Sequence, residues 1–168
     1  MSKGSLFARV SAAIALSLIV SVAACKTAPK KEETSELANP NAAVDDSTLG
    51  DSDSGKAAGL KTIHFPYDSI VLSSEAKSDL KNNAEIMKAK TSLRIQIEGH
   101  ADQRGGIQYN IALGEKRANS VKKFMEELGI TGDRLTTISY GKERPIDSST
   151  TEEAYSKNRR ANFVITTK

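Results

Sequence analysis

One arginine lies on the apolar face of a helix predicted over residues 108–128. Leu113, Arg117 and Val121 are four residues apart, so all three fall on one stripe that faces the core. A buried, unpaired charge is costly, and an arginine does not relieve that cost by losing its proton. Arg117 therefore either forms a structural ion pair or binds an anionic ligand.

The loop that precedes this helix, residues 99–106, carries a carboxylate at Asp102 among three glycines. Glycine allows a close approach of the backbone, and a helix start favours anions. A carboxylate and a guanidinium in one pocket suit a zwitterion. The carboxylate accepts hydrogen bonds from the ammonium, and the guanidinium donates two parallel hydrogen bonds to the ligand carboxylate. The head group of a free amino acid is such a zwitterion.

Catalysis and metal binding are the alternatives for this loop. His100 near Asp102 suggests a base with an orienting acid, but no nucleophile is suggested beside them. Two histidines without a cluster of further ligands do not support a metal site. We expect no enzyme activity, no cofactor and no metal.

The elements that position these residues follow from hydrophobic periodicity and turn signals. A helix after residue 72 begins at Ser73 or Ser74, and the helix over 108–128 ends at Gly129. Alternation over 93–98 predicts a strand with one buried face. Further strands are predicted at 63–65, 134–140 and 160–166, with a short helix at 151–157. The order βαβαβ(α)β predicts an α+β domain with one mixed sheet and helices packed on one face.

The N-terminus has the layout of an export signal. A basic start with Lys3 and Arg9 precedes an apolar run over 12–22 that is too short to span a bilayer. Val22-Ala23-Ala24-Cys25 resembles the bacterial lipobox, so we expect residues 1–24 to be removed and Cys25 to be acylated. Where bacteria sort lipoproteins by the residue after the acylated cysteine, an aspartate there signals retention in the inner membrane. Here that residue is Lys26, so the outer membrane is the expected location.

Residues 25–60 follow as a lipidated cysteine and a flexible tether, and residues 61–168 form the expected domain. The tether is rich in polar residues and has no sustained period, so it cannot bury enough apolar surface to fold. Loss of Lys3 and Arg9, the only charged residues before Cys25, lowers the formal charge from +3 to about +1. That charge does not support nucleic-acid binding.

Three blocks of the chain resemble the OmpA-like peptidoglycan-binding family. The stretch from Glu98 to Val121, EGHADQRGGIQYNIALGEKRANSV, is very similar to the family signature. The blocks SYGKERP over 139–145 and KNRRA over 157–161 follow in the family's order. The resemblance covers about residues 62–166, which is essentially the whole predicted domain.

The resemblance implies that the ligand is the diaminopimelate of the peptidoglycan stem peptide. In this family the aspartate that matches Asp102 binds the ammonium, and the arginine that matches Arg117 binds the carboxylate. His100 is expected to shape the loop, and Arg159 either lies near the site or only braces the fold. Further positions match the pocket or its rim: Asn110, Leu113, Asp68 and Ser69.

The resemblance also implies partners. Lipoproteins of this family dock with a TolB-like periplasmic protein on a surface that overlaps the peptidoglycan site. They tether the outer membrane to the cell wall and act in envelope integrity and division. A domain that kept the protein contact and changed the peptidoglycan contact stays open as an alternative, and competition between the two ligands is the expected behaviour.

Overall fold

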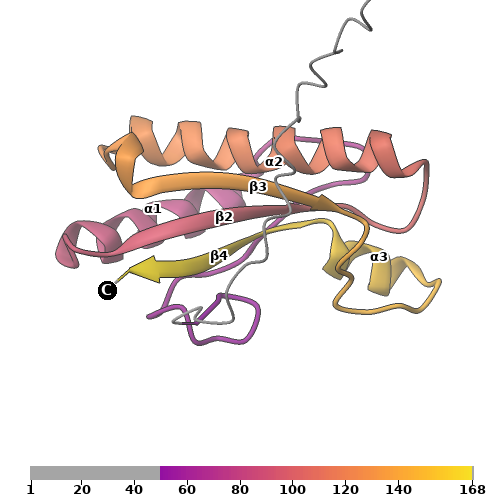
Figure 1. Ribbon diagram of the computed structural model, residues 1–168, viewed down its shortest axis with the longest axis horizontal. Helices are drawn as coiled ribbons and strands as arrows, with labels where there is room; N and C mark the ends of the chain where they lie inside the picture. The colour runs from indigo at the N-terminus through magenta and orange to yellow at the C-terminus, as the bar shows by residue number, and fades with distance from the viewer. Residues whose placement is uncertain (1–49, 168) are drawn as a thin grey trace, which may run out of the picture. The chain divides into compact units, whose positions relative to one another are not determined.

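The computed structural model describes residues 50–167 (Figure 1). The expected signal segment, the acylation site Cys25 and residues 26–49 of the expected tether lie outside the described residues. Within residues 50–167, no helix is both long enough and apolar enough to cross a bilayer.

Four strands form one mixed sheet in the order β1-β4-β2-β3. β4 pairs antiparallel with both β1 and β2, whereas β2 pairs parallel with β3. The strands are β1 (Ile63–His64), β2 (Arg94–His100), β3 (Leu135–Gly141) and β4 (Arg160–Thr167). The α+β class, the mixed sheet and the predicted order of elements are confirmed, with bounds shifted by one or two residues. A single 3-10 turn, Gly132–Arg134, precedes β3.

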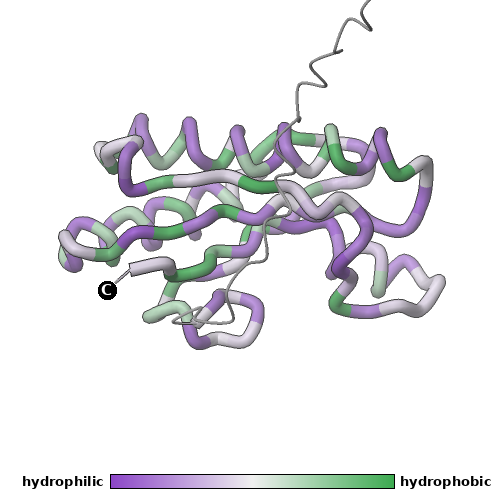
Figure 2. The backbone as a smooth tube through the Cα atoms, viewed as in Figure 1, coloured by the Kyte–Doolittle hydropathy of each residue, from purple (hydrophilic) through white to green (hydrophobic). Residues whose placement is uncertain are grey.

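Two long helices cover the sheet, α1 (Ser74–Ala89) and α2 (Ile107–Glu127), and the short α3 (Glu152–Asn158) precedes β4. Hydrophobic and hydrophilic residues alternate along both long helices (Figure 2). The apolar stripe of α1 buries Leu80 and Met87. That of α2 buries Val121, which the periodicity predicted, and Met125, which it did not. Ser73 is the N-cap of α1, and its Oγ accepts a hydrogen bond from the Ala76 amide at 3.0 Å.

A pair of glycines allows α2 to lie close against the sheet. A Cβ at Gly99 of β2 would overlap the carbonyl oxygen of Gly114 in α2, and a Cβ at Gly114 would lie 2.7 Å from the carbonyl oxygen of Gly99. Any larger residue at either position would push helix and strand apart. Because Arg117 lies one turn after Gly114, this contact fixes how deeply the arginine enters the domain.

Residues 50–60 belong to the folded domain, which corrects the expected tether boundary at residue 60. Asp51 forms a bridge with Val164, and the Ser52 amide donates to the Phe163 carbonyl at 2.9 Å. Ala57 and Leu60 are buried in the core. The composition of the segment is polar, but the part of β4 that extends beyond the short β1 supplies backbone partners that composition does not reveal.

Candidate functional site

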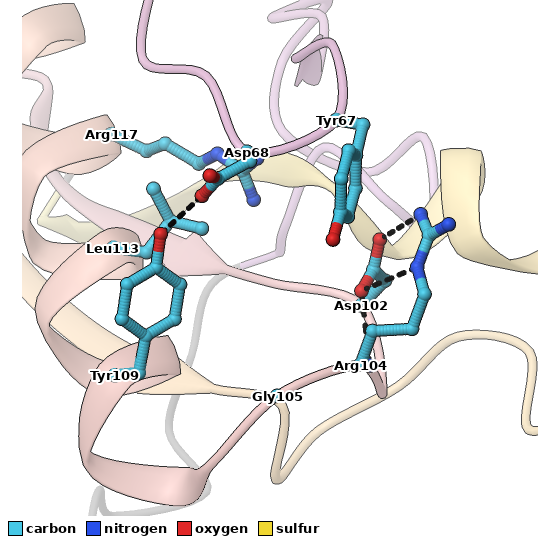
Figure 3. A pocket seen from close by; sticks show the side chains of 8 residues that line it. All are labelled: Tyr67, Asp68, Asp102, Arg104, Gly105, Tyr109, Leu113 and Arg117. Atoms are coloured by element: carbon cyan, nitrogen blue, oxygen red, sulfur yellow. Dashed lines mark hydrogen bonds and ion pairs between the residues drawn. The ribbon is translucent and has the colours of Figure 1, made fainter.

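A pocket of about 250 Å³ lies where three segments meet: the loop after β1, the loop after β2, and the first turns of α2. Figure 3 shows the side chains that line it. Asp102 and Arg117, which were predicted from different elements, both reach it. The lining residues are Tyr67, Asp68, Asp102, Arg104, Gly105, Tyr109, Leu113 and Arg117.

Arg117 is fully buried, as its place on the apolar stripe predicted. Its Nε, Nη1 and Nη2 donate to the carbonyl oxygens of Ser69 at 3.0 Å, His100 at 2.8 Å and Pro66 at 3.2 Å. No carboxylate within residues 50–167 forms an ion pair with it, so the structural ion pair is not found. Desolvation lowers the pKa of Arg117 to about 10 against the attraction of Asp102, so the side chain stays charged at neutral pH.

Asp102 is almost fully buried and is held by two arginines. Oδ1 accepts from the Arg104 backbone amide at 3.1 Å and from Arg104 Nε at 3.3 Å. Oδ2 accepts from Arg104 Nη2 at 2.6 Å and from Arg159 Nη1 at 3.3 Å. Burial raises the pKa of Asp102, but the hydrogen bonds from Arg104 outweigh it and leave the pKa below its usual value. Asp102 is therefore ionised.

Behind the pocket, Arg159 and Asn110 brace the loops. Arg159 is 8% exposed and binds Asp102, Glu152 of α3 at 2.8 Å, and the carbonyl oxygen of Phe65 at 3.1 Å. Asn110 is buried, and its Nδ2 donates to the Arg104 carbonyl at 2.8 Å. Neither side chain lines the pocket, and both hold the loop that carries Asp102.

The outer wall is formed by the loop after β1 and by α2. Asp68 has φ of 47°, and its carboxylate accepts a hydrogen bond from the Tyr109 hydroxyl of α2 (Figure 3). Leu113 supplies the apolar wall, as the family motif implied. Ser69 reaches the site through its carbonyl oxygen, which binds Arg117, while its hydroxyl accepts from the Val71 amide.

The imidazole of His100 does not line the pocket, and its expected part in shaping the loop stays a prediction. Along β2, Gly99 faces α2, so the neighbouring side chain of His100 points to the other face of the sheet. There it stacks on Tyr140 with centroids 5.7 Å apart, and its Nε2 lies 3.6 Å from Glu98 Oε2. Only the His100 carbonyl contributes, as an acceptor for Arg117.

Four lining residues were missed by the sequence analysis: Tyr67, Arg104, Gly105 and Tyr109. Helical spacing was enough to find Tyr109, which lies four residues before Leu113 and eight before Arg117. Tyr67 is next to Asp68, a position that matches the pocket or its rim in the family. Arg104 gave no periodic signal because it lies in an irregular loop, and its position depends on contacts with Asp102 and α3.

The described part of the chain, residues 50–167, contains no cluster of three or more histidine, cysteine, aspartate or glutamate side chains arranged to hold a metal ion. The side chains that line the pocket include the buried guanidinium of Arg117, the partly exposed guanidinium of Arg104, two carboxylates and two tyrosines. Such a set favours binding of a charged ligand.

Comparison with known proteins gives a consistent family. The model of the OmpA family matches residues 64–159. A peptidoglycan-associated lipoprotein of Brucella melitensis is 35% identical over 152 residues, 90% of each chain. One from Buchnera aphidicola is 40% identical over 100 residues, 60% of this chain and 58% of that protein. The crystal structure of the peptidoglycan-associated lipoprotein from Burkholderia pseudomallei superposes with a TM-score of 0.62 at 31% identity, covering 67% of this chain and 96% of that one.

Proposed function

This chain belongs to the OmpA family, and on that premise we propose that it is an outer-membrane lipoprotein that binds peptidoglycan non-covalently through the diaminopimelate of the stem peptide. Membership of this family makes it a binding protein and not an enzyme. The proposal extends to its cellular role as a tether between outer membrane and cell wall in a Tol–Pal-type system that acts in envelope integrity and division.

The observation that carries the proposal is the buried guanidinium of Arg117. A guanidinium has five N–H groups, and three of them donate to backbone carbonyls, which leaves one on Nη1 and one on Nη2. Arg117 lines the pocket, and no carboxylate within the described domain forms an ion pair with it. One N–H group on each Nη atom can donate to each of the two oxygens of a ligand carboxylate.

Asp102 supplies the opposite pole of the same pocket. It is ionised and lines the cavity with Arg117, so a ligand that spans the two carries an ammonium near its carboxylate. The D-centre of diaminopimelate is such a group, and Leu113 and Tyr109, which line the pocket, would contact its methylene chain. Asp68 lines the pocket and the carbonyl of Ser69 holds Arg117, while Asn110 and Arg159 act by holding the loop.

The anchoring part of the proposal rests on the sequence. Acyl chains on Cys25, after removal of residues 1–24, would fix the chain to the outer membrane, and the residues up to about 49 would connect the anchor to the domain. Each contact with the wall is modest in strength, but many copies of the protein on one polymer add their contributions. The Brucella relative, itself named a peptidoglycan-associated lipoprotein, aligns over 90% of this chain.

The test compares two stem peptides by calorimetry on the purified chain. One carries meso-diaminopimelate, and the other carries lysine, which keeps the ammonium but lacks the carboxylate at that centre. Loss of a buried, charge-assisted pair costs at least about 2 kcal/mol, so we expect the lysine peptide to bind at least roughly 30-fold more weakly. Asp102→Asn, which keeps the size of the side chain, should weaken binding of the diaminopimelate peptide.

The result that would reject the proposal is equal affinity for the two peptides, because Arg117 would then not bind a ligand carboxylate. Failure of the folded chain to bind either peptide would reject peptidoglycan as the ligand. Circular dichroism of Asp102→Asn serves as the control that the variant is folded, since Asp102 also holds Arg104 and Arg159.

A second ligand, a TolB-like periplasmic protein, is favoured by the apolar rim of the pocket. Five exposed hydrophobic side chains lie in the two segments that border it: Tyr67, Ile70, Val71, Ile107 and Tyr109. Exposed apolar surface beside a polar pocket is typical of protein-binding sites. Excess diaminopimelate peptide should reduce binding of such a protein, and simultaneous binding at full affinity would show that the two sites are separate.

A further inference from the structure

The carboxylate of Asp102 has no acceptor position left for a ligand. An ionised carboxylate offers about four lone-pair sites, two on each oxygen. Oδ1 accepts from the Arg104 amide and Nε, and Oδ2 accepts from Arg104 Nη2 and Arg159 Nη1. A ligand ammonium therefore has to displace one of these donors before Asp102 can bind it.

The side chain of Arg104 is the donor that can leave. It is 35% exposed and lines the pocket, whereas the side chain of Arg159 is 8% exposed and is also held by Phe65 and Glu152. Arg104 supplies two of the four bonds through Nε and Nη2, so its departure frees one position on each oxygen of Asp102.

The surroundings of Arg104 form a slot for a guanidinium. Its Cζ lies 4.1 Å from the ring centroid of Tyr67 and 4.5 Å from that of Tyr155. Nη1 lies 3.2 Å from Glu152 Oε2 on α3. Figure 3 shows the Arg104 fork beside Asp102 and the Tyr67 ring. Glu152 is an exposed residue at the start of α3. It can therefore keep its ion pair with Arg104 after Arg104 has lost its hydrogen bonds to Asp102.

We propose that Arg104 occupies the cation subsite of the pocket and is displaced by the ligand ammonium, which makes it a specificity-determining residue. This inference rests on the proposed function, since it names the group that the diaminopimelate ammonium must replace. A simple amine would lose as much as it gains by replacing Arg104. A zwitterion also gains the two free N–H groups of Arg117, so only a ligand with both charges binds well.

Arg104→Ala tests the proposal because it empties the slot. A site that is competent in only about 1–10% of molecules has its affinity reduced by that fraction, so the variant should bind the diaminopimelate peptide roughly 10- to 100-fold more tightly than the wild type. The matched control is Arg94→Ala, which removes the same charge from an exposed pair with Asp133 at the other end of β2. This control should bind as the wild type does.

Added guanidinium gives an independent measurement. In Arg104→Ala, guanidinium chloride at about 20 mM, far below denaturing concentrations, should refill the slot and weaken peptide binding, while sodium chloride at the same concentration should not. In the wild type the two salts should act alike. The NMR signals of the Tyr67 and Tyr155 rings should shift with guanidinium in the variant only.

The outcomes separate the two proposals. If the wild type binds, unchanged peptide binding by Arg104→Ala would overturn the displacement. Weaker binding would also overturn it and would assign Arg104 a direct contact with the ligand. Failure of both chains to bind the peptide would reject the proposed function. In that case the NMR signals of the Tyr67 and Tyr155 rings still test whether the slot binds a cation. A shift caused by guanidinium alone supports a cation subsite, and the absence of that shift overturns it.

Discussion

Replacement of Arg117 by methionine separates its structural role from its role in binding. Methionine has a similar length but neither charge nor donors. Three carbonyl oxygens, those of Pro66, Ser69 and His100, would lose their donor. A buried acceptor left without a partner costs about 1–3 kcal/mol, so the three together cost roughly 3–9 kcal/mol.

An opposing effect reduces this cost. Desolvation lowers the pKa of Arg117 to about 10, which corresponds to roughly 3 kcal/mol against the charged form in the folded state, and an apolar side chain avoids this cost. The cost of the three unsatisfied carbonyl groups exceeds the gain from removing the desolvated charge. We expect Arg117→Met to lower the free energy of unfolding by about 3 kcal/mol, which urea denaturation would show as a midpoint lower by roughly 1–3 M.

Arg134 provides the matched control, because it also donates to three carbonyl oxygens and lies away from the pocket. Its Nε binds Leu93 at 3.0 Å, and its Nη2 binds Met87 and Lys90, both at 2.8 Å. Arg134→Met should also destabilise the fold but leave binding of the diaminopimelate peptide unchanged, whereas Arg117→Met should lose both. An Arg117→Met variant as stable as the wild type would refute the reasoning, since the three carbonyls would then not need the guanidinium.

Three further perturbations test the packing, the N-terminal segment and the pH dependence. Gly114→Ala should cost about 1–3 kcal/mol in a thermal melt, because its Cβ meets the Gly99 carbonyl, whereas Gly106→Ala, which meets nothing within 4 Å, should cost less than about 1 kcal/mol. Asp53→Asn removes the charged partner of the buried Arg160, whose Nε lies 2.8 Å from Asp53 Oδ2, and should lower stability by about 2–4 kcal/mol. The variant should also be cleaved faster by proteases near residue 55. Unchanged proteolysis would show that other contacts hold the segment. Burial lowers the pKa of His100, so the folded state binds its proton less readily than the unfolded state; stability is complete above about pH 6.5 and falls below it, by up to roughly 1.4 kcal/mol per pH unit. His100→Gln should flatten that slope between pH 6.5 and 5 in denaturation curves, and an unaltered slope would assign it to other groups.

Periodicity predicted those parts of the fold in which one face of an element is buried. The apolar stripe of α2 correctly predicted that Arg117 is buried. The alternation in β2 correctly predicted a buried face, which carries Ile95 and Ile97. The same alternation places the His100 side chain on the face opposite to that of Gly99.

The segment 50–60 could not be predicted because its partners are distant in sequence. Ser52 binds the Phe163 carbonyl and Asn162, more than 100 residues away. The position of Arg104 is hidden for the same reason, since Glu152 and Tyr155 reach it only after α3 has folded against the loop. Local composition indicates how much apolar surface a segment can bury. It does not indicate which hydrogen-bonding or charged partners a segment distant in the sequence provides.

Charge balance explains why a zwitterion suits this site better than an anion or an amine. Three guanidinium groups, Arg104, Arg117 and Arg159, are set against three carboxylates in and behind the pocket: Asp68, Asp102 and Glu152. A ligand of either single charge would leave a net charge in a partly desolvated cavity, which is unfavourable. A zwitterion keeps the sum unchanged and gives Arg117 the carboxylate that the described domain does not provide. The desolvation cost carried by Arg117 in the free protein is then reduced on binding, so part of the affinity comes from a charge that the fold holds without a counter-ion.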